Sequence, residues 1–309
     1  MDIKDYSTYY GTGILNKIGA EIFIIRKYST NNNIYFLTVN PRSLQTSVIE
    51  DTDIKFNIIK SSLQDIRTKY RDTNYIKSLI HAEKNALPLQ NAGITNIRVP
   101  GAGVFLTADL CPSGLPLDKL LFTETIEKFT NTSKPLPVGL CVTGLWLEKH
   151  AEDVKWINAL YQKGALSVTW INHSYYHRFA KDLPLKNNFL LMPGVKLDNE
   201  VLNTEKKMLE LGLVPSVFFR FPGLVSDREL FFKITGYGLI PLGSDAWLAK
   251  NQEPKEGSIV LVHANGNEPA GIYRFFKLLK DERENITKKR WYLLDLRESL
   301  SQMINDSFD

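Results

Sequence analysis

The chain has few of the residues that build disulfide-rich or membrane-spanning proteins. It holds only two cysteines in 309 residues, Cys111 and Cys141, which are too few for a disulfide framework. Each falls in or just after an apolar run, so two separately buried thiols are a better interpretation than one bridge. No run approaches the roughly 18 consecutive apolar residues of a membrane span, and we therefore expect no transmembrane helix.

A long block of basic residues is also missing. The net charge is +4 and the isoelectric point about 8.8, spread along the chain, so we expect no nucleic-acid partner. Residues 1–5 lack the basic start and apolar run of a signal peptide. The chain is then either cytoplasmic or a mature secreted chain whose signal has been removed.

What is present describes an ordinary globular protein. Hydrophobic residues make up 43% and charged residues 23%, and the length corresponds to roughly two domains. The dipeptide Pro100-Gly101 predicts a turn. We expect a boundary there, between an N-terminal α/β extension or cap of residues 1–100 and a second domain of residues 101–309.

After residue 100, short apolar runs alternate with amphipathic segments, a pattern typical of a mainly parallel sheet or barrel. A long loop without periodicity is expected over Arg178–Leu197, above the rim where the strands end. The expected strands are 21–27, 33–39, 103–110, 137–143, 165–170, 216–221, 239–243 and 258–263. The expected helices are 72–89, 117–129, 151–163, 199–211 and 227–235.

Two of the five histidines, His173 and His177, stand four residues apart. On a helix or a helical turn this spacing places both imidazoles on one face, where they can bind one metal ion. The same spacing also arises in an exposed polar pair. His81 and His150 have no partner motif, and we expect both to face solvent.

Four further polar clusters fall at or just past predicted strand ends, where α/β enzymes collect catalytic groups. With the histidine pair they run in the order Asp109, His173-x-x-x-His177, Arg220-x-Pro-Gly223, Asp245-x-Trp247 and Leu261-x-His263. In this order residues 101–309 resemble the polysaccharide deacetylases with a NodB homology domain, carbohydrate esterase family 4. The fold that this resemblance implies is a distorted (β/α) barrel.

The resemblance also implies roles. His173 and His177 correspond to ligands of a divalent metal, usually zinc, and Asp109 to the general base that Arg220 keeps ionised. His263 corresponds to the general acid, oriented by Asp245. The substrate or oxyanion pocket is expected to include Gly223 as a backbone N–H donor, with Trp247, Leu261 and Tyr176 beside it.

The first motif departs from the family pattern. The family carries two adjacent aspartates there, base then ligand, whereas this chain has Leu110 in the ligand position. Water or Asp109 itself is the expected third ligand. Cys111, which shares a strand face with Asp109, is a further candidate, weighed below a buried thiol without a ligand role.

These features predict a metal-dependent hydrolase that removes acetyl groups from an N- or O-acetylated polysaccharide. Two alternatives stay open: a catalytically lapsed glycan-binding protein, because Leu110 cannot bind zinc, and a related amidohydrolase acting on a small cyclic amide. For the leading prediction we expect a secreted or periplasmic protein, with a cytoplasmic one as the alternative. The oligomeric state stays open.

Overall fold

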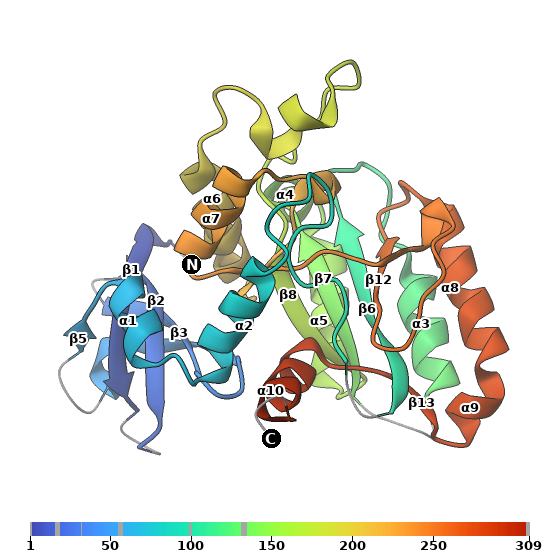
Figure 1. Ribbon diagram of the computed structural model, residues 1–309, viewed down its shortest axis with the longest axis horizontal. Coiled ribbons are helices and arrows are strands. Elements are labelled where there is room, and N and C mark those ends of the chain that lie inside the picture. Colours follow the sequence, from blue (N-terminus) through green and yellow to red (C-terminus); the bar gives the residue numbers. More distant parts are fainter. Residues whose placement is uncertain are drawn as a thin grey trace.

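The computed structural model describes residues 2–15, 19–31, 33–54, 58–98, 101–130 and 135–306, with side chains up to residue 302. Two sheets organise these residues (Figure 1): an antiparallel one near the N-terminus and a parallel one that carries the rest of the chain. No helix in the described ranges is both long and apolar enough to cross a membrane.

The N-terminal sheet has five strands in the order β4-β3-β2-β1-β5. Strand β2 reads Glu-Ile-Phe-Ile-Ile-Arg-Lys-Tyr-Ser-Thr and is buried on both faces, as a central, nearly continuous apolar strand should be. Strand β3 agrees with its expected range, β2 runs three residues beyond the expected 21–27, and α2 lies inside the longer helix expected there. The elements are β1 Lys4–Ile14, β2 Glu21–Thr30, β3 Asn33–Val39, β4 Thr46–Glu50, β5 Ile59–Lys60, α1 Leu63–Lys69 and α2 Asn74–Glu83.

The second sheet has eight strands, all parallel, in the order β10-β9-β8-β7-β6-β12-β11, with β13 paired to β6. The two edge strands, β10 and β11, are not neighbours in this order, so the curled sheet is an open half-barrel. The expected distorted (β/α) barrel is confirmed. Its strands are β6 Ala102–Leu110, β7 Leu136–Val142, β8 Leu166–Asn172, β9 Phe218–Phe219, β10 Ile240–Pro241, β11 Ala246–Trp247, β12 Ile259–His263 and β13 Trp291–Leu293.

Helices cover the outside of this sheet, with α3 and α8 side by side at one end in Figure 1. The expected helices correspond to α3, α5, α6 and α7, each within two residues at either end. The helices are α3 Lys119–Lys128, α4 Gly144–Lys149, α5 Ala151–Gln162, α6 Leu197–Glu210, α7 Arg228–Gly236, α8 Pro269–Asp281, α9 Arg283–Thr287 and α10 Leu296–Asp306.

The carboxyl ends of the parallel strands meet at one rim, which positions the site. The register pairs His263 of β12 with Asp109 of β6, so these two side chains come from neighbouring strand ends. The loop expected over residues 178–197 projects above this rim in Figure 1. It contains two short 3₁₀ turns, Leu185–Asn187 and Phe189–Leu191.

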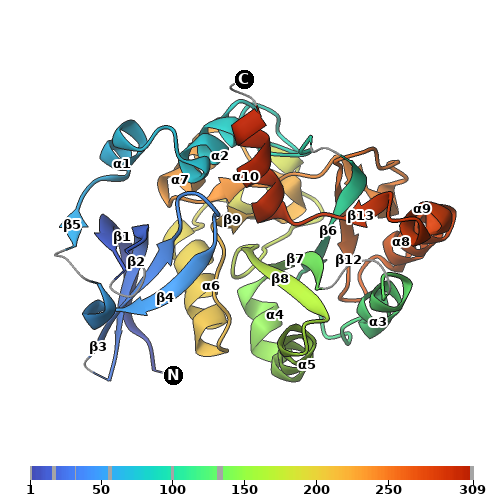
Figure 2. The same cartoon turned by 90° about the horizontal axis from the view of Figure 1, so that it is seen from below.

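The N-terminal sheet packs against the half-barrel without a break in the core. One cluster of buried side chains includes Phe23 and Leu37 of the first sheet together with Phe218 and Ile240 of the second. Figure 2 shows α6 between the two sheets, and α10 lies against α2. The expected boundary at residue 100 stays a prediction, because Pro100 of its turn lies outside the described residues.

Neither remaining histidine faces solvent as expected. His150 is 8% exposed, its ring stacks on Trp146, and its two nitrogens lie near an oxygen of Asp153 and the Ser113 carbonyl. His81 is half-buried on α2, and burial lowers its pKa. The error has one cause, because a single polar residue without a partner motif gives no sign in the sequence of which face it occupies.

Candidate functional site

Strand β6 delivers two potential functional side chains to the rim. Successive side chains of an extended strand point to opposite faces, so Asp109 and Cys111 lie on one face and Leu110 on the other. Leu110 is fully buried in the outer core between the sheet and its covering helices. The side chain in the family's ligand position thus faces away from the pocket, and Cys111 faces into it.

The two histidines come together in a way that the sequence did not predict. Residues 173–177 form neither a helix nor a helical turn, which corrects the expected geometry. Ser174 and His177 adopt left-handed backbone angles, with φ of 68° and 47°. These two residues turn the chain back on itself, so the imidazole ring centroids lie 4.9 Å apart.

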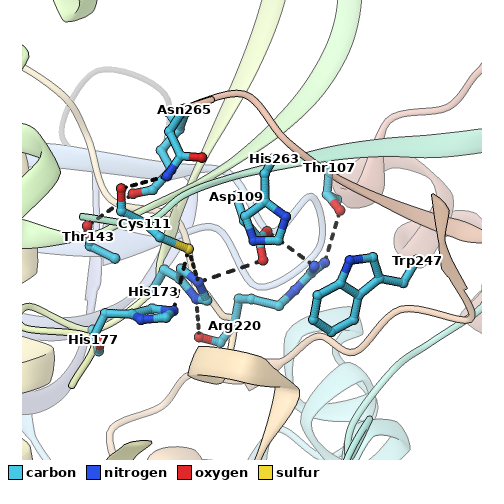
Figure 3. A network of polar contacts seen from close by, with 12 residues as sticks. Thr107, Asp109, Cys111, Thr143, His173, His177, Arg220, Trp247, His263 and Asn265 are labelled. Carbon is cyan, nitrogen blue, oxygen red and sulfur yellow. Dashed lines mark hydrogen bonds and ion pairs between the residues drawn. The ribbon is translucent and has the colours of Figure 1, made fainter. Parts of the chain in front are cut away.

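Cys111 completes a three-ligand cluster with the histidines (Figure 3). Its Sγ lies 3.6 Å from Nε2 of His173 and 3.4 Å from Nε2 of His177. Zinc bonds of about 2.3 Å to sulfur and about 2.05 Å to nitrogen, placed tetrahedrally, would set such donors about 3.5 Å apart. The donor set of one thiolate and two imidazoles also suits zinc, so these residues fit the metal that the resemblance implies.

The histidines are held in the form that binds metals. Nδ1 of His173 lies 2.8 Å from the Arg220 carbonyl oxygen, which places the proton on Nδ1 and leaves the Nε2 lone pair free. Burial lowers the pKa of His177 to about 3, with the neighbouring His173 adding to the effect. Both rings are therefore neutral near pH 7.

Cys111 differs from them. Burial and the charge of Asp109 raise the pKa of its thiol well above the usual value. The thiolate form at this position therefore requires a cation beside it. A metal ion that binds here would displace the thiol proton and supply that charge.

Asp109 is buried and kept ionised. Burial alone would raise its pKa, but Arg220, with His173 and His263 nearby, brings it below the usual range. Nη1 of Arg220 donates to Oδ1 of Asp109 at 3.3 Å, and Oδ2 lies 3.7 Å from Nε2 of His173. The Cys141 thiol lies against the same carboxylate and also lowers its pKa. Arg220 is fully buried and gives a second hydrogen bond to Thr107, so its guanidinium is held in place.

His263 ends β12, and its register partner on the neighbouring strand is Asp109; both are labelled in Figure 3. Its Nδ1 is 2.9 Å from Oε2 of Glu268, and Nε1 of Trp247 donates to the same oxygen at 2.7 Å. Burial would raise the pKa of Glu268, but these two contacts lower it. Glu268 is therefore the carboxylate that lies beside His263.

The expected partner of His263, Asp245, is in the wrong place. It is exposed, and it accepts hydrogen bonds from the Ile259 N–H and from Asn96, each at 3.1 Å. Because β11 pairs in parallel with β12, Asp245 lies level with Ile259 at the beginning of that strand. His263 ends the strand, four residues or ~13 Å further along. Asp245 therefore orients the β12 backbone and not the imidazole.

One pocket of about 620 Å³ is lined by the donor cluster together with Asp109, His263 and Glu268. Leu261 is 1% exposed and forms part of its wall, whereas Tyr176 is 37% exposed at its rim. Gly223 has φ of 61°, and a Cβ there would lie 2.4 Å from the ring of Phe189, so only glycine fits. All the site residues expected from the sequence, except Asp245, line this pocket or contact a residue that does.

Sequence reasoning missed several residues of this pocket, among them Glu268 and Phe189. Glu268 precedes the Pro269 that begins α8. A carboxylate in the loop after a strand that ends in histidine is the signal that could have identified it. Phe189 lies in the loop without periodicity, where no pattern marks a pocket residue.

No protein-family profile matches the chain. Among solved structures, a family 4 carbohydrate esterase from Bacillus anthracis has a TM-score of 0.50 and 17% identity, over 72% of this chain and 91% of that one. The fold is that of the family 4 carbohydrate esterases.

Other similar structures carry the same family description. A Streptomyces lividans family 4 enzyme in complex with acetate has a TM-score of 0.40 and 19% identity, over 63% of this chain and 93% of that one. A mutant family 4 pseudoenzyme with restored activity has a TM-score of 0.46 and 14% identity, over 96% of this chain and 92% of that one.

Proposed function

We propose that the chain is a metal-dependent hydrolase that removes acetyl groups from an N- or O-acetylated polysaccharide. The observation that carries the proposal is the convergence of three groups in one pocket. Cys111, His173 and His177 form a donor cluster, the Asp109–Arg220 pair lies beside it, and His263 enters the same pocket from the strand next to Asp109. Fold similarity alone would not support an activity.

Each protein group has a distinct task in such a reaction. When bound, a divalent ion such as zinc supplies a Lewis acid that lowers the pKa of a coordinated water. Asp109, ionised beside Arg220, accepts the proton of the attacking water. His263, oriented by Glu268, donates a proton to the leaving amine or alcohol. Leu261 and Trp247 form apolar walls suited to the acetyl methyl group, and Gly223 is the candidate backbone donor for the developing oxyanion.

The direct test is acetate release from acetylated chito-oligosaccharides. We expect Asp109→Asn to lower kcat by roughly 10²–10⁴-fold, because the amide cannot accept the proton. Asp245→Asn is the matched control, since it removes a carboxylate that lies outside the pocket and contacts Asn96, Ser258 and the β12 backbone. Equal rates for wild type and Asp109→Asn would contradict the proposal.

Glu268→Gln tests the contact with His263. We expect kcat to fall, but by less than the roughly 10²–10⁴-fold that loss of a proton-transfer group costs, because Glu268 acts only through the imidazole. KM should change little, since the Trp247 indole still has an oxygen to donate to. A rate equal to that of wild type, with Asp245→Asn impaired instead, would restore the sequence-based assignment.

The glycan-binding alternative rests on Leu110, which offers no ligand where the family has one. Metal analysis and saccharide binding together distinguish the two functions. A purified chain that binds acetylated saccharides but takes up no zinc or cobalt would favour the binding protein.

The cyclic-amide alternative requires a closed pocket, whereas Tyr176 and the 61% exposed Phe179 bring this pocket to the surface. A polymer substrate is consistent with secretion or a periplasmic location.

A further inference from the structure

One buried carboxylate holds the loop between the two histidines. Glu200, in the first turn of α6, is 2% exposed. Its Oε2 accepts hydrogen bonds from the backbone N–H groups of Tyr175 and Tyr176, both at 2.9 Å. These are consecutive amides between His173 and His177. Glu200 itself does not line the pocket.

The loop needs such support because of its backbone. Ser174 and His177 adopt left-handed angles although neither is glycine. Residues with side chains keep such angles only where the surroundings fix them. A loop free to relax would move His177 away from the Cys111 thiol, which now lies 3.4 Å from its Nε2.

A second tie joins the same two segments. Asn172 is fully buried, donates from Nδ2 to the Val201 carbonyl of α6 at 2.9 Å, and accepts at Oδ1 from the Ser174 N–H at 3.0 Å. Helix α6 thus contacts the loop through the residue before His173 and through the amides that precede His177. The helix is itself held firmly, since Arg26 of the N-terminal sheet pairs with its buried Glu205.

We propose that Glu200 is a positioning residue of the metal site. It sets the separation of the two imidazoles by accepting both amides of the turn between them, and it touches neither metal nor substrate. The role rests on the proposed function only in that His173 and His177 hold a metal ion. Through Glu200, helix α6 and the N-terminal sheet that pairs with it help to determine the shape of the catalytic pocket.

The test is Co²⁺ binding, followed by competition with a chelator and by the thiolate-to-cobalt charge-transfer absorption. We expect Glu200→Ala to lower Co²⁺ affinity by roughly 10–100-fold, as other groups behind metal ligands do, and to change the absorption band. Glu200→Gln should restore affinity to within a few-fold, because its amide oxygen can accept both N–H groups. Glu210→Ala, at the C-terminal end of the same helix, where the carboxylate pairs with Lys206 and Lys207, is the control and should match wild type.

Two results would overturn the inference. One is a folded Glu200→Ala that binds Co²⁺ with the affinity and spectrum of wild type, which would leave the deacetylase proposal intact. The other is a wild-type chain that binds no Co²⁺, which would end both. If Glu200→Ala does not fold, Glu200→Asp replaces it, because the carboxylate retracts by one methylene and loses at least one amide. Unchanged affinity in that variant would likewise overturn the positioning role.

Discussion

Replacing Cys111 by alanine should remove tight metal binding. Only two imidazoles would then remain of the donor cluster, and Asp109, at 3.7 Å from His173, is engaged with Arg220. We expect a loss of zinc affinity larger than the roughly 10–100-fold that follows from changing a group behind a ligand. Acetate release should fall in parallel, and added zinc should restore part of it. Metal content after gel filtration and chelator competition provide the measurement.

Cys111→Asp is the matched variant. A carboxylate of similar reach can still bind zinc, so metal should stay bound while the thiolate-to-cobalt band disappears. Leu110→Asp should not rescue Cys111→Ala, although it restores the family's adjacent aspartates. Leu110 is fully buried in the outer core, and a carboxylate there would be unpaired and would lower the free energy of unfolding by several kcal/mol. Full zinc affinity in Cys111→Ala alone would show that the thiol is not a ligand.

The sequence predicted the membership of the site better than its geometry. Asp109, Arg220 and His263 follow or end apolar runs, and parallel strands bring such residues to one rim whatever lies between them. Their convergence therefore needed only the order of strands. Asp245 follows the same rule in the sequence but fails in the structure, because it lies level with Ile259, four residues behind the end of β12. A register of this kind depends on pairing across the sheet, which no local pattern records.

The conformation of the histidine turn also depends on distant contacts. A spacing of four residues permits a helical turn. Asn172 at the end of β8 and Glu200 of α6 instead stabilise a bend in which Ser174 and His177 have left-handed backbone angles. Cys111 was weighed below a plain buried thiol for a similar reason. Its burial is real, at 5% exposure, but only the folded loop shows that two imidazoles lie beside it.

In the N-terminal region the central strands were predictable and their neighbours were not. Strand β2 contains a continuous apolar run that is visible in the sequence. Strand β1 reads Lys-Asp-Tyr-Ser-Thr-Tyr-Tyr-Gly-Thr-Gly-Ile and is largely polar. Pairing with β2 is what makes it a strand.

Helix α8, in the second region, was missed although Pro269 at its first turn is a typical start signal.

Arg26→Ala should lower the free energy of unfolding by about 3–5 kcal/mol, because it leaves the Glu205 carboxylate buried without its partner. Arg26 is fully buried in β2 and donates to both carboxylate oxygens of Glu205 on α6, at 2.7 and 2.9 Å. It also donates to the Tyr237 carbonyl at 2.8 Å. Denaturant unfolding of the full chain measures the loss.

Two controls separate the burial of this pair from its charge. Lys233→Ala breaks the exposed Lys233–Glu229 pair and should leave the free energy of unfolding nearly unchanged. The double variant Arg26→Met with Glu205→Leu removes both charges and fills their space, so it should be far more stable than Arg26→Ala. A small effect of Arg26→Ala would mean that the N-terminal sheet and α6 do not depend on each other. A large one, with reduced Co²⁺ affinity in the folded protein, would extend the chain of contacts from Arg26 through α6 to the metal ligands.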